Sequence, residues 1–385
     1  MIALTAAALL TPTKRVEMPL VLIEDGVIVE VASHGTREIP TGCTVMDFSE
    51  DVLAPGFVDL HLHGGAGWDV MDPAPEALPA VEKLVAGHGV TAFFPTTVTA
   101  SLDATLRALE RLARAVERAA KGNEGLRARP LGIHLEGPFI SHARRGVHPP
   151  EHLLPPTSAA FERFWEAASG HIRMMTIAPE LPGALEVIAQ AAVRGVCLSA
   201  GHSDANLTEM RAGVEAGVRH ATHTFNAMRP LGHRDPGIVG EILTDERVSA
   251  DIIADGIHLD PAVVKLFLEC KSHDKAVLIT DATAATGMPD GRYRLGAMEV
   301  EVREGRCLSE GRLAGSVLTM DRAVRNTMKF GEWSLMHAVQ AATLNPAKVA
   351  NLPWVGRVET GARADFVVLS SHGEVRRTII GGRVA

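Results

Sequence analysis

Short apolar segments alternate with amphipathic, helix-like segments through most of the chain. The clearest amphipathic segment follows Ser101, a typical helix N-cap, and has Leu102, Leu109 and Val116 on one helical face. Eight short apolar segments are expected to be strands: residues 53–62, 90–98, 130–135, 174–178, 196–200, 221–225, 249–254 and 276–280. Eight strands with intervening helices predict an α/β fold, a (β/α)8 TIM barrel rather than an open sheet.

The two ends of the chain have a different pattern, which is typical of β-hairpins. Residues 21–23 and 27–29 are apolar and flank Asp25-Gly26, a strong two-residue turn signal. Residues 364–369 and 377–380 repeat the pattern, and Gly381-Gly382 forms the second turn. We therefore predict a small β-sandwich domain built from both termini, residues 1–51 and 345–385, and a barrel of residues 52–344.

Composition and charge narrow the choice of partners. Hydrophobic residues make up 46% and charged residues 22% of the chain, which suits a large core. The formal net charge of −8 argues against nucleic acid and against anionic membranes as partners. The four cysteines are scattered without a CxxC pair, there is no basic leader, and no apolar run reaches the length of a membrane span. A cytoplasmic protein is expected.

Polar residues with metal-binding chemistry recur where the predicted strands end. His61 and His63 end the first strand, and residues i and i+2 of a strand point to the same side. The third, fifth, sixth and eighth strands end near Glu136, His202, His223 and Asp281. Active sites of (β/α)8 barrels lie at the carboxyl ends of the strands. We therefore expect these side chains to meet at one rim.

Each of these residues also has a structural explanation of its own. Glu136 suits a turn, His202 and His223 suit loops, and Asp281 suits a helix N-cap. Their joint placement favours chemistry, because one carboxylate and two imidazoles are the His2Glu donor set of catalytic zinc sites. His61 and His63 are expected to hold a second ion, with Glu136 bridging and Asp281 opposite as general base. Such donors suit Zn, Fe, Co or Mn.

The order of the motifs resembles a known family. The motifs are Pro55-Gly56-Phe57-Val58-Asp59, His134-Leu135-Glu136-Gly137-Pro138-Phe139, Ser199-Ala200-Gly201-His202-Ser203, Thr222-His223-Thr224-Phe225-Asn226-Ala227-Met228, Ile253-Ala254-Asp255-Gly256-Ile257-His258, Thr280-Asp281-Ala282-Thr283 and Leu313-Ala314-Gly315-Ser316. With them the chain resembles the N-acetylglucosamine-6-phosphate deacetylases of the metal-dependent amidohydrolase superfamily. The resemblance covers nearly the whole chain.

The resemblance implies a reaction, its machinery and a partner. The reaction is hydrolysis of N-acetylglucosamine 6-phosphate to glucosamine 6-phosphate and acetate, in amino-sugar catabolism. It implies that Glu136, His202 and His223 bind the main metal and that Asp281 is the general acid/base acting on a metal-activated water. Some members replace His61 and His63 and use one ion, so one or two divalent ions per subunit are expected here.

The resemblance also implies a sugar-phosphate pocket. It is formed by Val147, His148, Asn226, Ala227, Arg234, Asp255, Gly256, Ile257, His258, Leu313, Ala314 and Gly315. His148 is expected to act in catalysis as well, by donating a hydrogen bond to the developing oxyanion. In the family the arginine that corresponds to Arg234 can come from a neighbouring subunit, so a homodimer is implied.

Two other functions fit the residues. A different amidohydrolase, acting on a cyclic amide or an N-acyl amino acid, would be indifferent to the 6-phosphate. A non-catalytic sugar-phosphate sensor would need a lost ligand or a lost base, and the sequence keeps all of them.

Overall fold

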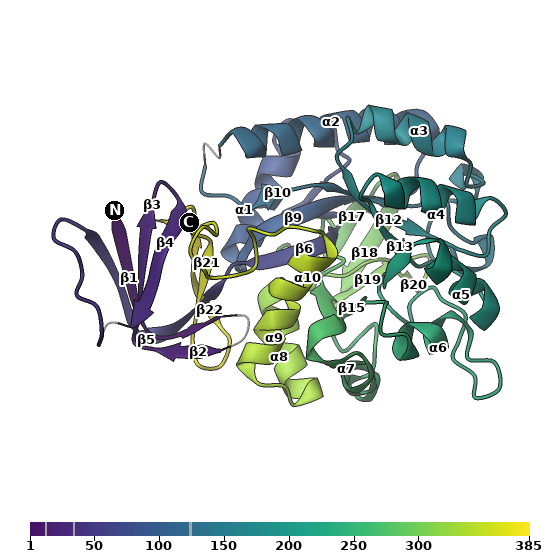
Figure 1. Ribbon diagram of the computed structural model, residues 1–385. Helices are drawn as coiled ribbons and strands as arrows, with labels where there is room; N and C mark the ends of the chain where they lie inside the picture. Colours follow the sequence, from purple (N-terminus) through teal and green to yellow (C-terminus); the bar gives the residue numbers. More distant parts are fainter. Residues whose placement is uncertain (12–13, 34, 123–124) are drawn as a thin grey trace.

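The protein has two parts, a helix-covered barrel and a sheet made from the two ends of the chain (Figure 1). The computed structural model describes residues 1–11, 14–33, 35–122 and 125–385. Strands from the purple N-terminal end and the yellow C-terminal end lie side by side in the terminal sheet, and both chain ends belong to it.

Eight parallel strands form the barrel, as the sequence predicts. They are β6 (Phe57–Leu62), β9 (Val90–Thr97), β11 (Ile133–Glu136), β12 (Ile172–Ile177), β13 (Cys197–Ala200), β14 (Val218–Ala221), β15 (Ala250–Ile253) and β16 (Ala276–Ile279). Neighbours pair in this order from β6 to β14, and β15 pairs with β16. The short strand β10 (Arg129–Pro130) pairs with β9 before β11 begins.

Hydrogen bonds from residues just beyond one strand to a residue inside the next close the ring at its remaining two joins. Thr224 N donates to Asp251 O at 2.9 Å and joins β14 to β15. Asp281 N donates to His61 O at 2.9 Å and joins β16 to β6. Both donors, Thr224 and Asp281, follow the carboxyl ends of their strands, where the sequence predicts the site. The α/β barrel prediction is confirmed.

Helices surround the strands. They are α1 (Ala77–Gly87), α2 (Leu102–Lys121), α3 (Ser158–Ala167), α4 (Ala184–Val193), α5 (Leu207–Ala216), α6 (Gly237–Thr244), α7 (Pro261–Lys275), α8 (Met320–Gly331), α9 (Leu335–Ala341) and α10 (Leu344–Val349). The predicted N-cap of α2 is confirmed, since the Ser101 side chain accepts from Ala104 N at 3.4 Å. Leu109, Leu112 and Val116 of α2 are buried. Among the described residues, no helix is long and apolar enough to cross a membrane.

The terminal sheet contains eight strands. They are β1 (Ile2–Leu10), β2 (Arg15–Glu17), β3 (Pro19–Glu24), β4 (Val27–Ser33), β5 (Thr44–Pro55), β21 (Phe366–Leu369), β22 (Val375–Ile380) and β23 (Arg383–Val384). Their order is β23-β22-β21-β5-β1-β3-β4, and β2 pairs with β1. Ile28 N donates to Ala362 O at 2.9 Å, so the β4 edge returns to the segment before β21. One curled sheet therefore encloses the core of this part.

Both predicted hairpin turns are present. Asp25 and Gly26 have φ values of +49° and +76°, and Gly381 and Gly382 have φ values of +58° and +77°. Two consecutive residues with positive φ are the conformation of a type I′ turn, which the twist of a hairpin favours. Strand β5 runs past residue 51 to Pro55, so it links the terminal sheet to the barrel. The domain bounds at 51/52 and 344/345 stay a prediction.

Two features differ from the sequence prediction. The sixth strand was expected at residues 221–225, but β14 ends at Ala221, because the following backbone turns with φ of +32° at His223 and +78° at Phe225. A four-stranded sheet that was not predicted follows β16. Its strands are β17 (Gly291–Leu295), β18 (Met298–Arg303), β19 (Arg306–Ser309) and β20 (Arg312–Leu313).

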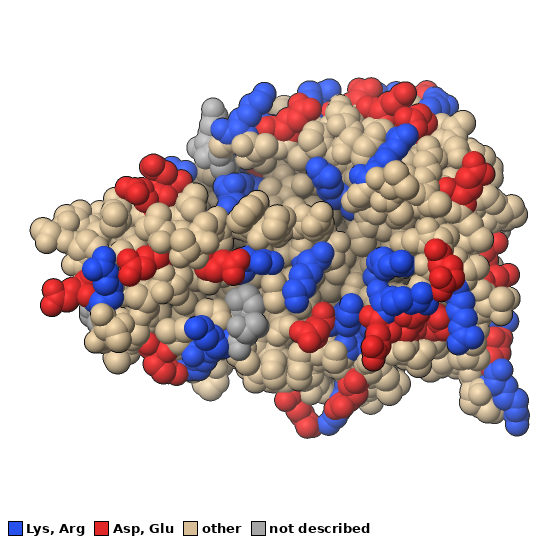
Figure 2. Space-filling view, in the orientation of Figure 1, with Lys and Arg blue, Asp and Glu red and all other residues tan. Residues whose placement is uncertain are grey.

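Lys and Arg side chains are interspersed with Asp and Glu side chains on the face shown in Figure 2. This mixture agrees with the small negative net charge of the sequence.

Candidate active site

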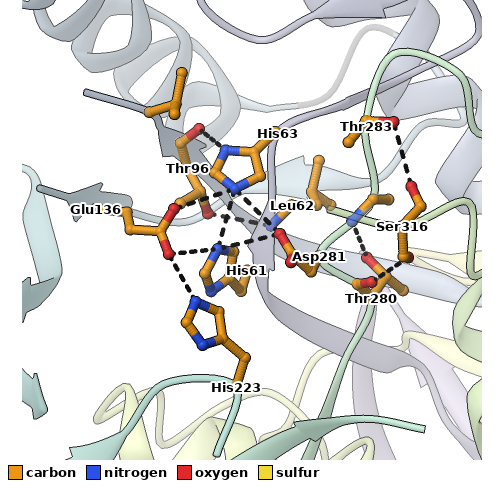
Figure 3. A network of polar contacts seen from close by, with 12 residues as sticks. His61, Leu62, His63, Thr96, Glu136, His223, Thr280, Asp281, Thr283 and Ser316 are labelled. Carbon is orange, nitrogen blue, oxygen red and sulfur yellow. Dashed lines mark hydrogen bonds and ion pairs between the residues drawn. The ribbon is translucent and has the colours of Figure 1, made fainter. Parts of the chain in front are cut away.

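Side chains at or just beyond the carboxyl ends of β6, β11, β14 and β16 meet at one rim of the barrel (Figure 3). His61 and His63 come from the end of β6, and their Nε2 atoms lie 3.5 and 3.3 Å from the two carboxylate oxygens of Glu136. Asp281 Oδ1 lies 3.5 Å from His61 Nε2 and 3.2 Å from His63 Nε2. All four residues are buried. The predicted convergence of these side chains is therefore present.

Glu136, His202 and His223 form a second, tighter group. Glu136 Oε1 lies 3.2 Å from His202 Nε2 and 3.0 Å from His223 Nε2, and the two Nε2 atoms are 3.1 Å apart. Ligands of a tetrahedral zinc ion bind at about 2.0–2.1 Å, which places their atoms roughly 3.3 Å from one another. The spacing of this trio therefore fits one shared divalent ion.

Two of the histidines are oriented as metal ligands usually are, with Nδ1 facing a backbone carbonyl and Nε2 facing the cluster. His63 Nδ1 lies 3.0 Å from Thr96 O, and His202 Nδ1 lies 2.9 Å from Arg144 O. A carbonyl oxygen only accepts, so each Nδ1 carries a proton. Nε2 would offer its lone pair to an ion after releasing the second ring proton, which otherwise lies between Nε2 and Asp281 or Glu136. Metal-ligating histidines usually donate their second ring N–H in this way. Nδ1 of His61 and of His223 is buried without a hydrogen-bond partner.

His148 has the opposite arrangement. Thr99 N donates to His148 Nδ1 at 3.3 Å, and the Thr99 hydroxyl, 2.8 Å from the same nitrogen, can donate to it too, so the ring proton of the neutral imidazole lies on Nε2. That N–H lies 3.6 Å from Glu136 Oε2. Burial, together with nearby His202, lowers the pKa of His148 to about 3. Glu136, His148 and His202 are close enough to surround an ion, but a protonated Nε2 cannot bind a metal. His148 is therefore a hydrogen-bond donor, and His223 is the better ligand.

The two carboxyl groups of the cluster are anionic. Burial would raise the pKa of Glu136, but the charge of His61 and hydrogen bonds from His202 and His223 hold the pKa well below its usual range. Burial would also raise the pKa of Asp281, but hydrogen bonding to His63 and the charge of His61 lower it to about 2. A cluster of anionic carboxylates and imidazoles is the donor set of a divalent cation.

Three of these residues have left-handed backbones. The φ values are +47° at His202, +32° at His223 and +51° at Asp281, a region that costs free energy for residues with a side chain. The surrounding structure holds each turn: the Asp251 carboxylate accepts from His223 N, and Ser316 N donates to Asp281 O at 2.7 Å. These turns direct the three side chains toward the cluster, whereas a regular continuation of the strands would direct them elsewhere.

Asp59 connects the first and eighth strands beneath the cluster. Its Oδ2 accepts from Thr280 Oγ1 at 2.6 Å, and its Oδ1 accepts from His61 N and Thr280 N at 3.3 Å each. Burial raises the pKa of Asp59 to about 7, although these hydrogen bonds oppose the rise. Asp59 thereby holds His61 and Thr280, the residue before Asp281, in fixed positions relative to each other.

A pocket of about 230 Å³ lies above the cluster. Eight of the residues predicted to bind substrate line it: Val147, His148, Asn226, Ala227, His258, Leu313, Ala314 and Gly315. Four further lining residues were not predicted: Val98, Gly146, Ile253 and Leu295. Val98 and Thr99 follow the second strand, so the strand-end rule that found the metal cluster would also have found them. Leu295 lies in the small sheet that the sequence pattern did not reveal.

The other predicted substrate residues lie outside the lining. Asp255 Oδ2 binds His258 Nδ1 at 2.7 Å, and Asp255 Oδ1 accepts from Ile257 N at 2.7 Å. Asp255 thus holds His258 in place, while Gly256 and Ile257 form the turn between them. Arg234 lies in an exposed loop away from the pocket. No lysine or arginine lines the pocket within the described residues.

Comparison with known proteins identifies the family. A model of the amidohydrolase family matches residues 52–385. The chain belongs to the amidohydrolase family. This amidohydrolase is 37% identical to the N-acetylglucosamine-6-phosphate deacetylase of Lysinibacillus sphaericus, with 94% of this chain and 92% of that protein covered. It is 38% identical to the N-acetylgalactosamine-6-phosphate deacetylase of Escherichia coli O157:H7, and the match covers 99% of this chain and 98% of that protein.

A solved structure is similar over the full length. It is a mutant N-acetyl-D-glucosamine-6-phosphate deacetylase from Mycobacterium smegmatis, in complex with N-acetyl-D-glucosamine-6-phosphate. Its sequence is 35% identical, its TM-score is 0.92, and the match covers 100% of this chain and 98% of that one. The barrel and the terminal sheet are thus both shared with that enzyme.

Proposed function

We propose that this amidohydrolase hydrolyses N-acetylglucosamine 6-phosphate to glucosamine 6-phosphate and acetate, as a step in amino-sugar catabolism. The observation that carries the proposal is the buried Glu136, His202 and His223 trio with Asp281 beside it, at the floor of a pocket. The relatives named deacetylases of N-acetylated amino-sugar 6-phosphates support the choice of substrate class.

Glu136, His202 and His223 would hold the main ion. His61 and His63, with Glu136 and Asp281, would hold a second. When bound, a divalent ion lowers the pKa of water from 15.7 to about 7 and polarises the carbonyl group of the amide. The donor set suits Zn, Fe, Co or Mn, and one or two ions per subunit. The spacing of the trio, 3.0–3.2 Å between donor atoms, supports the main site most strongly.

Asp281 serves as the general acid/base. Its carboxylate is buried and anionic, because His63 and His61 outweigh burial and lower its pKa to about 2. It can therefore accept the proton of the attacking water and then pass that proton to the leaving amine. Its carboxylate lies beside the cluster, and the Ser316 N–H holds its backbone carbonyl in place.

His148 stabilises the oxyanion. The neutral ring has its proton on Nε2, because Nδ1 accepts from Thr99 N. The Nε2–H group lies in the pocket, near Glu136. Negative charge develops on the carbonyl oxygen only as water adds, so a donor fixed before the reaction favours the transition state over the bound amide.

The phosphate group requires a cation, and none of the described residues that line the pocket is a lysine or arginine. Arg234 is exposed, and its guanidinium has no ion pair within the part of the chain that the structure describes. We infer that Arg234 of a second copy completes the pocket, in a homodimer, since arginine binds phosphate oxygens in a bidentate manner. Leu231 in the same loop is 47% exposed, which gives this surface an apolar residue to bury. The cytoplasmic location stays a prediction.

N-acetylgalactosamine 6-phosphate is a second candidate substrate. The relative with that activity in its name is 38% identical and matches 99% of this chain. The two sugars differ only in the configuration of one hydroxyl group, at C4.

Acetate release from the two phosphorylated sugars, from unphosphorylated N-acetylglucosamine and from an N-acetyl amino acid tests the proposal. We expect release from N-acetylglucosamine 6-phosphate at the highest kcat/KM. Faster release from the galactose isomer would assign the second candidate. Release from the amino acid derivative but from neither sugar phosphate would overturn both.

A further inference from the structure

A second polar cavity lies at the opposite end of the barrel from the active site. It has a volume of about 540 Å³ and is lined by residues of the terminal sheet and by Arg129, which begins β10 at the amino-terminal side of the barrel. The two predicted hairpin turns meet here, since a Cβ atom on Gly26 would lie 3.5 Å from Gly381 Cα. The deacetylation reaction uses none of these residues.

The cavity contains an excess of guanidinium groups. Arg129, Arg363 and Arg383 line it together with one acidic residue, Asp25. Arg129 is 1% exposed, and its Nη2 donates to Asp365 Oδ2. Of the three, only Arg129 is buried, and a buried charge is stable only when it is paired; Arg363 and Arg383 are partly or fully exposed and add two positive charges at the same cavity, which favours an anion there.

The one buried carboxylate of this region is already shared. Arg363 Nε lies 3.6 Å from the same Asp365 Oδ2 that Arg129 contacts, so two guanidinium groups converge on one oxygen. Asp365 Oδ1 accepts from Gly381 N at 2.8 Å. Both carboxylate oxygens are therefore engaged, and within the described residues the guanidinium groups of Arg129 and Arg363 contact no other carboxylate.

Unsatisfied donors remain at the cavity. Nε of Arg129 is buried without a hydrogen-bond partner, and Nε of Arg363 has only the 3.6 Å ion pair with Asp365. The Arg383 guanidinium is exposed and makes no ion pair or hydrogen bond with the described part of the chain. Buried donors without acceptors are rare in proteins, and at a cavity they point to a group that binds there. Planar guanidinium donors bind the paired oxygens of phosphate and of carboxylate in a bidentate manner, and three positive charges suit the more highly charged phosphate group.

We propose that the Arg129, Arg363 and Arg383 cavity is a second phosphate-binding site, for inorganic phosphate or for a small phosphate ester. Apolar Ile23 and Ile380 also line the cavity, and they provide a surface for the organic part of an ester. The site bridges the barrel and the terminal sheet, because Arg129 belongs to the barrel and Arg363 and Arg383 to the C-terminal segment. Bound phosphate should therefore stabilise the two parts against separation.

Calorimetric titration of the metal-loaded protein with inorganic phosphate tests the proposal. The R363Q/R383Q double variant should lose one phosphate per chain, or bind it at least tenfold more weakly, with unchanged deacetylation kinetics. Phosphate bound at the active site is the same in the wild type and in R363Q/R383Q, so the difference between their binding isotherms reports this cavity alone. The R376Q/R377Q variant is the matched control, since it removes two exposed arginines from β22 of the same sheet. It should bind phosphate as the wild type does.

Glucose 6-phosphate, which has no acetyl group to lose, distinguishes the two sources of the phosphate group. Tighter binding than inorganic phosphate at the same site would assign an ester, and weaker binding would assign free phosphate. A crystal of the wild-type protein grown with phosphate should show a tetrahedral anion between the three guanidinium groups. Equal phosphate binding by R363Q/R383Q and the wild type, or equal loss in both double variants, would overturn the proposal.

Discussion

Replacing His148 with phenylalanine tests the proposed oxyanion donor. Phenylalanine keeps an aromatic ring in this buried position and removes both ring nitrogens. The proposed donor is Nε2–H. Because Thr99 N donates to Nδ1 at 3.3 Å, the ring proton of the neutral imidazole lies on Nε2. Loss of one such donor costs about 2.7–4 kcal/mol of transition-state stabilisation. Because the His148 ring is neutral, and neutral donors are weaker than charged ones, we expect about 3 kcal/mol, or roughly a hundredfold decrease in kcat.

How the loss divides between kcat and KM is as informative as its size. The contact forms only as charge develops on the carbonyl oxygen, so KM should change little while kcat falls. Burial and nearby His202 lower the pKa of His148 to about 3. The ring is therefore neutral from pH 6 to pH 9, and the ratio of wild-type to variant kcat should be constant across that range.

The assay is steady-state acetate release over pH 6–9, with metal content and thermal unfolding measured on the same samples. The variant leaves Thr99 N without its acceptor, which should cost about 1–3 kcal/mol of stability. His152→Phe, a half-buried histidine of the same loop, is the control and should retain normal kcat. A decrease of less than tenfold, or a ratio that changes around pH 6–7, would refute the role of His148 as a neutral donor.

Three further predictions concern other residues. Asp281→Asn should lower kcat by about 10²–10⁴ with the main ion still bound by elemental analysis, and normal turnover would remove Asp281 as the base. Arg234→Ala should raise KM for the phosphorylated sugar by roughly 10–100-fold, whereas an unchanged KM would place the phosphate elsewhere. Burial lowers the pKa of Lys271 to about 8, so the unfolded chain binds more protons between pH 8 and pH 10.5 and the free energy of unfolding should rise with pH there. Lys271→Met should flatten that rise in urea titrations, the exposed control Lys83→Met should not, and equal slopes for Lys271→Met and the wild type would contradict the shift.

The sequence pattern was sufficient to predict the barrel and the rim at which the site lies. Apolar strands alternate with amphipathic helices, and this local periodicity is what a (β/α)8 barrel imposes on a chain. The i, i+2 spacing of His61 and His63 placed both on one side of β6, and their Nε2 atoms do lie 3.2 Å apart. The alternation of strands and helices and the placement of the two histidines both depend on residues close together in the sequence, so they can be predicted before the fold is known.

Features that depend on distant contacts could not be derived in this way. The turn at His223 depends on the Asp251 carboxylate, 28 residues further along the chain. The proton position on His148 depends on Thr99, 49 residues away. The strands of β17–β20 have the same hairpin pattern as the terminal sheet, so nothing local shows that Leu295 covers the active site. The Arg129–Asp365 contact joins residues 236 apart.

The rate of acetate release from N-acetylglucosamine 6-phosphate, measured on metal-loaded protein and again after chelation, tests the central claim most directly. Glu136, His202 and His223 surround a single point, and the proposed hydrolysis assumes a divalent ion there. We predict that the loaded protein releases one acetate per glucosamine 6-phosphate formed, that chelation abolishes release, and that added metal restores it. No release from the loaded protein, or the same rate after complete removal of the metal, would contradict the account.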